Sequence, residues 1–301
     1  EPCQQYQSAY NSCGHRSCPH CQQHDTTQWL ARQQQKLLPV NYFMVTFTLP
    51  YQFRPLMLHH QKVLYALLFR CAVSTLQDFA KKSTKLGGDI GLTALLHTHT
   101  RKLDYHPHVH VIVPAGCVDK KRRQWRKLNG DYLFNVMALA KVFRARFIDG
   151  VNKLGLSIPP SAPVKWRVHC KSIGQGLPAL TYLSRYLYRG VINENNLLGD
   201  DGKNITFRYK ESQTNKMKTR SIEGADFIWL LLQHVLPKGF RRVRDYCYLH
   251  GNAKYLLRVI QLALGVIVPP HLAVSRPSMK CPCCQQPMAI IGFTHPIRSS
   301  P

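Results

Sequence analysis

The sequence is short of acidic side chains. Asp and Glu total 15 among 301 residues, whereas Lys and Arg total 41, so the formal net charge is +26. An excess of this size across a folded chain indicates a polyanionic partner, most often nucleic acid, although a ribosome-like or membrane-surface protein would share it. The excess also argues against an enzyme with a closed acidic pocket for small molecules.

Long apolar runs, low-complexity blocks and internal repeats are missing as well. The nearest approach to a membrane span, Tyr255–Pro270, is too short and carries Arg258 and Gln261, so no membrane partner is expected. No secretory signal is visible. The hydrophobic fraction of 45% does not suggest disorder, and 301 residues suffice for one large domain or two modest ones.

The basic residues are spread along the chain and recur in three runs, Asp119–Gly130, Tyr182–Gly190 and Lys238–Tyr246. Aromatic residues occur among them and can stack on bases while neighbouring cations bind phosphates. One such run is typical of a solvated face, but three runs with few acids favour a long nucleic-acid track. The candidate DNA-binding residues of the first run are Lys121, Arg122, Arg123, Trp125 and Arg126.

The 11 cysteines gather at the two ends of the chain. Cys18 and Cys21 form a C-x-x-C pair, whose thiolates can reach one tetrahedral Zn²⁺ from a tight turn. An odd count in a large chain favours a metal site over a disulfide scaffold. The candidates that complete the shell are Cys3 and Cys13, with His15 or His20 as substitutes.

The other cysteines fall into two groups. Cys281, Cys283 and Cys284 (“CPCC”) fit either half of a second zinc knuckle or an unpaired reactive cluster. The isolated ones lie in apolar or strand-like contexts and fit small core residues. They are Cys71, Cys117, Cys170 and Cys247.

Hydrophobic periodicity and turn residues predict strands and helices that intermix without a regular β-α-β period. Strands are expected over residues 41–50, 89–100, 108–113, 162–170 and 204–210. Helices are expected over residues 28–38, 59–82, 136–154, 177–189 and 224–236. The predicted fold is therefore α+β, with a mainly antiparallel sheet covered by helices on one side.

The stretch “YHPHVHVIVPAG” begins at Tyr105 and places histidines at the mouth of an apolar strand. Because side chains alternate along a strand, His108 and His110 share one face and the intervening valines pack on the other. Neutral imidazoles side by side make a platform for a divalent ion. A purely structural pair is the alternative. The H-x-H pattern of one class of zinc hydrolase is disfavoured, because Ile112 and Val113 stand where it needs an acid and a histidine.

The helix predicted over Leu177–Arg189 carries a polar stripe. Tyr182, Arg185, Tyr186 and Arg189 fall at i, i+3, i+4 and i+7, so they share one face. An amphipathic helix with half-buried tyrosines would show the same spacing. Two phenols interleaved with two guanidiniums also suit phosphate chemistry, in which Arg binds the phosphate and Tyr attacks it.

These motifs together resemble the two-tyrosine HUH transposases of rolling-circle insertion sequences, the IS-ninety-one type. “YHPHVHVIVP” is similar to the family's histidine–hydrophobic–histidine motif, and “YLSRY” to its paired tyrosine nucleophiles. The likeness extends over nearly the whole chain. The other similar segments are “YNSCGHRSCPHCQ”, “YFMVTFTLP”, “LLHTHTRKLDYHPHVH” and “ADFIWLLLQHVLPKGFRRVRDYCYL”.

The resemblance implies a zinc-binding module over residues 1–27, an HUH nuclease domain with the tyrosine helix over 28–220, and a helical, basic region over 221–301. It implies that His108 and His110 hold Mg²⁺ or Mn²⁺. His97 is the expected third ligand, with Asp104 and His106 as rivals. Tyr182 or Tyr186 would attack the phosphate and leave a 5′-phosphotyrosine, while Arg185 and Arg189 steady the DNA.

The implied partner is single-stranded DNA, at the element ends and at the target, with no nucleotide cofactor. The implied location is the bacterial cytoplasm, in association with the nucleoid. Two alternatives remain from the residues alone. One is a non-catalytic zinc-ribbon DNA-binding protein with the tyrosine helix in its core, and the other is a zinc-dependent hydrolase.

Overall fold

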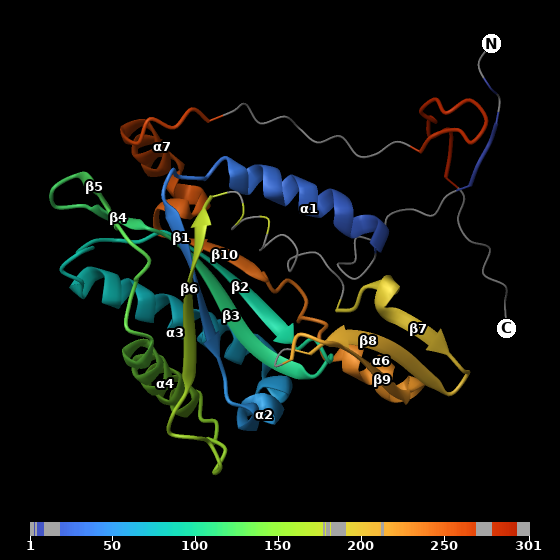
Figure 1. The fold of residues 1–301 in the computed structure, drawn as a ribbon, viewed down its shortest axis with the longest axis horizontal. Coiled ribbons are helices and arrows are strands. Elements are labelled where there is room, and N and C mark those ends of the chain that lie inside the picture. The colour runs from blue at the N-terminus through green and yellow to red at the C-terminus, as the bar shows by residue number, and fades with distance from the viewer. Residues whose placement is uncertain are drawn as a thin grey trace.

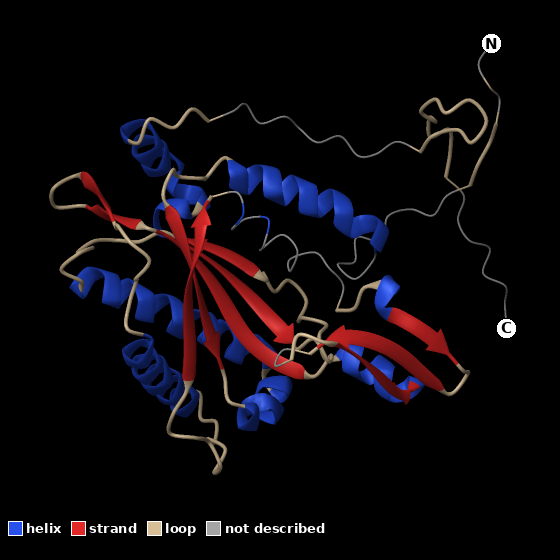
Figure 2. Ribbon diagram, viewed as in Figure 1, coloured by secondary structure: helices blue, strands red, loops and turns tan. Residues whose placement is uncertain are grey.

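The computed structural model describes residues 3, 5–8, 19–176, 178, 181, 191–211, 214–268 and 279–293, with the backbone alone described for 19–26 and 194. Its centre is a five-stranded antiparallel sheet in the order β10-β2-β3-β1-β6 (Figures 1 and 2). Four of these strands overlap the predicted strand ranges, whereas β10 was not predicted. The bounds are β1 Asn41–Thr48, β2 Leu92–His99, β3 Tyr105–Pro114, β6 Arg167–Gln175 and β10 Val243–Tyr246.

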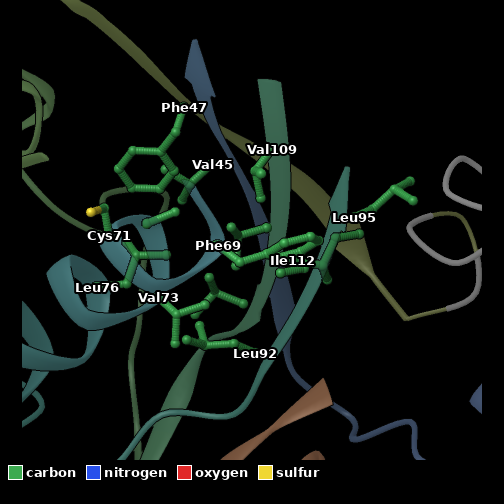
Figure 3. Packing of buried hydrophobic residues seen from close by; sticks show 14 of the residues in the cluster. Val45, Phe47, Phe69, Cys71, Val73, Leu76, Leu92, Leu95, Val109 and Ile112 are labelled. Atoms are coloured by element: carbon green, nitrogen blue, oxygen red, sulfur yellow. The ribbon is translucent and has the colours of Figure 1, made fainter. Parts of the chain in front are cut away.

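One face of the sheet forms the main hydrophobic core with helices α3 (Gln61–Lys82) and α4 (Val136–Lys153). Val109 and Val45 are fully buried against α3, as Figure 3 shows. The ring centroid of Phe47 lies 4.8 Å from that of Phe143 on α4. The predicted antiparallel sheet with covering helices is therefore confirmed.

The opposite face carries the polar residues of the sheet, and helix α1 (Pro19–Gln34) lies over part of it (Figure 1). Asp245 of β10 accepts hydrogen bonds from Thr93 of β2, from Gln33 of α1 and from Lys36 just after that helix. Helices thus pack on both faces, not on one. The helix also begins at Pro19, inside the segment assigned by sequence to the zinc module.

A second, smaller sheet lies beside the loop that joins β2 to β3. It is antiparallel, in the order β7-β8-β9, and has its own small core of Leu103, Phe207 and Phe227. The boundary predicted after residue 220 falls inside β9, and β10 beyond it belongs to the central sheet. The elements are β7 Leu197–Asp200, β8 Asn204–Lys210, β9 Met217–Glu223 and helix α6 Gly224–Leu232.

The remaining elements are short, and most of them lie around the central sheet. They are the hairpin β4 Gly116–Asp119 and β5 Gln124–Lys127, helices α2 Arg54–His59 and α7 Lys254–Ala263, and 3-10 turns at Tyr51–Phe53, Glu194–Asn196, Cys247–Leu249 and Gly251–Ala253. Within the described residues, α3 alone has the length and apolar composition of a membrane span. Most of α3 is buried inside the fold, as in the core helix of a folded domain.

Candidate active site

Three histidines meet on the polar face of the central sheet. His97 of β2 lies directly opposite His108 of β3, and His110 follows two residues later on the same face. Their ligand nitrogens all lie within 4.8 Å of one another. Three ligands that are 2.1 Å from one ion require separations of up to about 4.2 Å, so small ring movements complete a metal site.

The two rival ligands are engaged elsewhere. The carboxylate of Asp104 accepts a hydrogen bond from Arg220 of β9 at 3.0 Å. His106 accepts one from the Arg54 guanidinium on its Nδ1 at 3.3 Å. The structure therefore groups His97, rather than Asp104 or His106, with the H-x-H pair.

The hydrogen bonds of the H-x-H pair orient both rings. His108 Nδ1 lies 2.7 Å from the His106 carbonyl oxygen, which can only accept, so Nδ1 carries the proton and Nε2 keeps its lone pair. His110 Nδ1 lies 2.9 Å from Thr46 Oγ1, which leaves its Nε2 for the cluster. Thr46 reaches His110 because the two residues are partners in the β1–β3 register.

Burial keeps these imidazoles neutral. It lowers the pKa of His97 and of His108 well below the usual 6.5, and the pKa of His110 to about 4. Neighbouring histidines lower the pKa of His97 and His108 further, since a second positive charge nearby is unfavourable. All three rings therefore present lone pairs at pH 7, as metal ligation requires.

A second pair of histidines continues the row. His99 lies two residues beyond His97, and their ring centroids are 6.0 Å apart. The ring centroid of His99 is also 5.3 Å from that of His234. His234 follows α6 and donates from Nε2 to the Leu103 carbonyl at 2.9 Å. Burial, with His234 and Arg242, lowers the pKa of His99 to about 3. This contact ties the small sheet to the active-site end of the central sheet.

Arg242 brings a permanent positive charge to the cluster. Its Nε donates to the Leu96 carbonyl at 2.9 Å, and its own carbonyl accepts from the Leu96 amide at 3.0 Å. The charge of Arg242 lowers the pKa of His97, His99, His110 and His234. Sequence reasoning placed Arg242 in a basic run but had no signal that it faces the histidines.

Two family models match the chain. One, described as “Transposase zinc-binding domain”, covers residues 1–49, and the other, described as “Putative transposase”, covers residues 91–255. “Putative transposase y4qJ” of Sinorhizobium fredii (strain NBRC 101917 / NGR234) is 30% identical over 342 residues, covering 99% of this chain and 86% of the relative. The chain belongs to the IS91-type transposase family.

Another relative and a solved structure are also similar. The transposase for insertion sequence element IS801 of Pseudomonas savastanoi pv. phaseolicola is 30% identical over 278 residues, covering 86% of this chain and 67% of the relative. The metal-bound conjugative relaxase TrwC in complex with oriT DNA is 13% identical, covering 76% of this chain and 74% of the relaxase chain, with a TM-score of 0.36. That score is too low for a comparison of sites.

The transposase is thus a rolling-circle DNA strand transferase, and the resemblance found from its sequence is confirmed. The histidine cluster fits the HUH motif. The predicted nucleophiles and their arginines lie outside the described residues. They are Tyr182, Tyr186, Arg185 and Arg189.

The predicted DNA-binding hairpin of the transposase lies away from the histidines. Lys121, Arg122 and Arg123 are exposed in the β4–β5 turn, beyond the Pro114 end of β3. His108 is six residues from that end, or about 20 Å along the strand. The basic side chains of this turn therefore do not contact the cluster.

Trp125 of this hairpin is a packing residue in the structure. Its ring is half-buried, lies edge-on to Tyr248 at 5.6 Å and covers Gly116 so closely that a Cβ there would lie 2.2 Å from it. Stacking of Trp125 on bases stays a prediction. Arg126 donates to the Thr84 carbonyl at 3.1 Å, which fixes the hairpin to the loop after α3.

The edge strand β6 presents basic side chains on the face of the sheet that holds the cluster. Arg167 and His169 are partners of Thr48 and Thr46, which in turn are partners of His108 and His110. Arg167, His169 and Lys171 are exposed. They lie two strands, or about 10 Å, from the H-x-H pair. Sequence reasoning identified this strand without noticing its basic face.

Only part of the predicted zinc site lies within the described residues. Cys13 and Cys18 lie outside the described residues, and the side chain of Cys21 on α1 is not described. Cys3 lies beside Cys281 and Cys283 of the C-terminal “CPCC” segment. The isolated cysteines are free and buried or half-buried, which confirms them as core residues.

Proposed function

We propose that this IS91-type transposase holds one divalent cation on His97, His108 and His110 and transfers DNA strands beside it through Tyr182 and Tyr186. The observation that carries the proposal is the convergence of three neutral imidazoles within 4.8 Å. A set of three protein ligands leaves coordination positions open for phosphate oxygens, as catalytic sites require.

The donor set also bears on the choice of ion. Mg²⁺ prefers oxygen ligands, whereas imidazole nitrogen suits transition metals, so three histidines favour Mn²⁺ over Mg²⁺. When bound, the cation would polarise the scissile phosphate and stabilise the departing 3′ oxygen. Zn²⁺ is the ion proposed for the cysteines, because thiolates are softer ligands.

The tyrosines would supply the nucleophile. The phenol oxygen attacks phosphorus, the bond to the 3′ oxygen breaks, and that oxygen takes up the proton that the phenol loses. The products are a 5′-phosphotyrosine and a free 3′-OH, and attack by a 3′-OH on the phosphotyrosine reverses the step. The bond energy is retained, so no nucleotide cofactor is needed, and two tyrosines permit two successive transfers.

Chain connectivity supports a role for these tyrosines at the cluster. Val191 packs against the small core that contains Leu103, which lies in the loop between β2 and β3 at the histidine end of the sheet. Tyr186 precedes Val191 by five residues, and five residues of fully extended chain span at most about 18 Å. The phenol is thus within chain reach of this end of the sheet.

Two basic features would hold the substrate. Arg242 is placed to bind the phosphate at the cluster, because a guanidinium offers several donors to phosphate oxygens. The exposed Arg167, His169 and Lys171 of β6 would guide single-stranded DNA across the same face. We propose the element ends and the target as its sites, in the nucleoid of a bacterial cytoplasm.

The test is capture of the covalent intermediate. Single-stranded oligonucleotides that contain an element end are incubated with the protein and Mn²⁺, and the adducts are mapped by proteolysis and mass spectrometry. We expect a DNA–peptide adduct on Tyr182 or Tyr186, loss of all adducts in the Y182F/Y186F double variant and in His108→Ala, and no change in Tyr132→Phe, an exposed tyrosine after β5. An undiminished adduct in the double variant would overturn the proposal.

A further inference from the structure

We propose that a zinc ion joins the two ends of this chain, held by Cys3 from the N-terminal segment and by the C-terminal cysteines Cys281, Cys283 and Cys284. Figure 1 shows the N-terminal segment beside the C-terminal hairpin, away from the main sheet. The match to the zinc-binding family model ends at residue 49 and assigns no role to the C-terminal cysteines.

The sulfur positions suit a single ion. The Sγ atoms of Cys3, Cys281 and Cys283 lie within 4.8 Å of one another, and those of Cys3 and Cys281 are 3.8 Å apart. Two thiolates bound at 2.3 Å on a tetrahedral Zn²⁺ are separated by about 3.8 Å. Cys284 lies outside this group of three, but it also interacts with both Cys3 and Cys281, which makes it the candidate fourth ligand.

The C-terminal segment has the backbone of a metal-binding turn. The Met288 amide donates to the Met279 carbonyl at 2.7 Å, and the Cys281 amide to the Gln286 carbonyl at 2.9 Å, so residues 279–288 form a small hairpin. The amides of Cys283 and Cys284 point at the Cys281 sulfur. Such a turn directs both thiolates of a C-x-x-C pair, here Cys281 and Cys284, to one ion.

The described residues give this hairpin little other support. Ile290, Ile291 and Phe293 just beyond it are 79%, 78% and 72% exposed, whereas Cys281 at its centre is only 4% exposed. A short hairpin is marginal in water without further support. Metal binding is an established source of folding energy for segments too small to form a hydrophobic core. Zn²⁺ is the matching ion, because a set of thiolates selects it over harder cations.

Sequence reasoning could not pair these residues, because Cys3 and Cys281 are 278 positions apart. The “CPCC” segment lacked a second half in the sequence, and the structure supplies one from the opposite end of the chain. The site shares no residue with the histidine cluster.

Metal analysis of the full chain provides the first test. Zinc is quantified by mass spectrometry in the purified protein and in variants that each replace one cysteine by serine. We expect Cys3→Ser and Cys281→Ser each to lose one equivalent of zinc, and the double variant to lose the same single equivalent. Cys170→Ser, in the edge strand β6, should lose none. Unchanged zinc in Cys281→Ser, or additive losses in the double variant, would overturn the proposal.

A second test examines the link between the ends and does not depend on catalysis. A protease site is inserted after residue 268, and the full-length protein is cleaved there in its zinc-loaded state. We expect the C-terminal fragment to co-elute with the rest of the chain and to be released by a zinc chelator. A fragment that dissociates with zinc present, or that stays bound after zinc is removed, would contradict a zinc-mediated link.

Discussion

Replacing Thr46 by Val isolates the hydrogen bond that orients one proposed metal ligand. Thr46 Oγ1 lies 2.9 Å from His110 Nδ1 across the β1–β3 pairing. Val has nearly the same shape and suits a strand, so the sheet should be preserved. The change removes the partner of the non-ligating ring nitrogen and leaves His110 itself in place.

The size of the effect follows from the role of such partners. Groups that bind the second nitrogen of a ligating histidine contribute about 10- to 100-fold to metal affinity. That factor corresponds to about 1.4–2.7 kcal/mol of binding free energy. We therefore expect Thr46→Val to raise the dissociation constant for Mn²⁺ by about 10- to 100-fold, with DNA cleavage recovering when Mn²⁺ is saturating.

Thr48 provides a matched control on the same strand and face. It lies opposite His108, whose Nδ1 binds the His106 carbonyl oxygen instead. Binding of Mn²⁺ is measured by electron paramagnetic resonance without DNA, so the readout is separate from catalysis. Thr48→Val should bind Mn²⁺ within about two-fold of the parent protein. Equal affinities in the two variants would refute the proposed role of the Thr46–His110 hydrogen bond.

Three further predictions concern charge. Burial lowers the pKa of His99 to about 3 and of His106 and His110 to about 4, so the unfolded chain binds more protons below pH 6.5. The free energy of unfolding of the metal-free protein, measured in urea titrations, should therefore fall as the pH drops from 6.5 to 4. The slope should be shallower in His99→Gln, and an unchanged slope in that variant would contradict the role of His99. Arg242→Ala should lower the cleavage rate at saturating Mn²⁺ by about 10²-fold, because a charge that stabilises the transition state is lost. Arg258→Ala, on the exposed surface of α7, should leave the rate unchanged. Equal cleavage rates in the two variants would exclude Arg242 from the site. Lys171→Ala should reduce the slope of log affinity for single-stranded DNA against log salt concentration by about 0.7. The control is Lys153→Ala, which removes a cation paired with Asp149. The same slope in both variants would exclude a phosphate contact by Lys171.

The parts of the site that follow local periodicity could be predicted from the sequence. Alternation along β3 places His108 and His110 on one face and the valines on the other, and the structure has this arrangement. The choice of His97 as the third residue of the cluster also agrees with the structure. That choice rested on strand alternation, which could put His97 near the pair, but the register of β2 against β3 that decides it was not fixed by alternation alone.

The parts that depend on long-range packing were missed. His234 and Arg242 reach the cluster because α6 and β10 return to the active-site end of the sheet, and no local pattern reports such a return. The sequence shows Trp125 as an aromatic in a basic run, but it does not show that the ring packs over Gly116. Helix α1 begins at Pro19, nine residues before the predicted start, and the contact of its Gln33 with Asp245 is not visible in its polar sequence.

The most direct test of the account is the position of Mn²⁺ in a crystal of the protein, located by anomalous scattering at the manganese edge. We expect a single strong peak on the polar face of the central sheet, within bonding distance of one ring nitrogen each of His97, His108 and His110. A peak bound elsewhere on the sheet, or contacts to Asp104 or His106 in place of His97, would contradict the proposed metal centre.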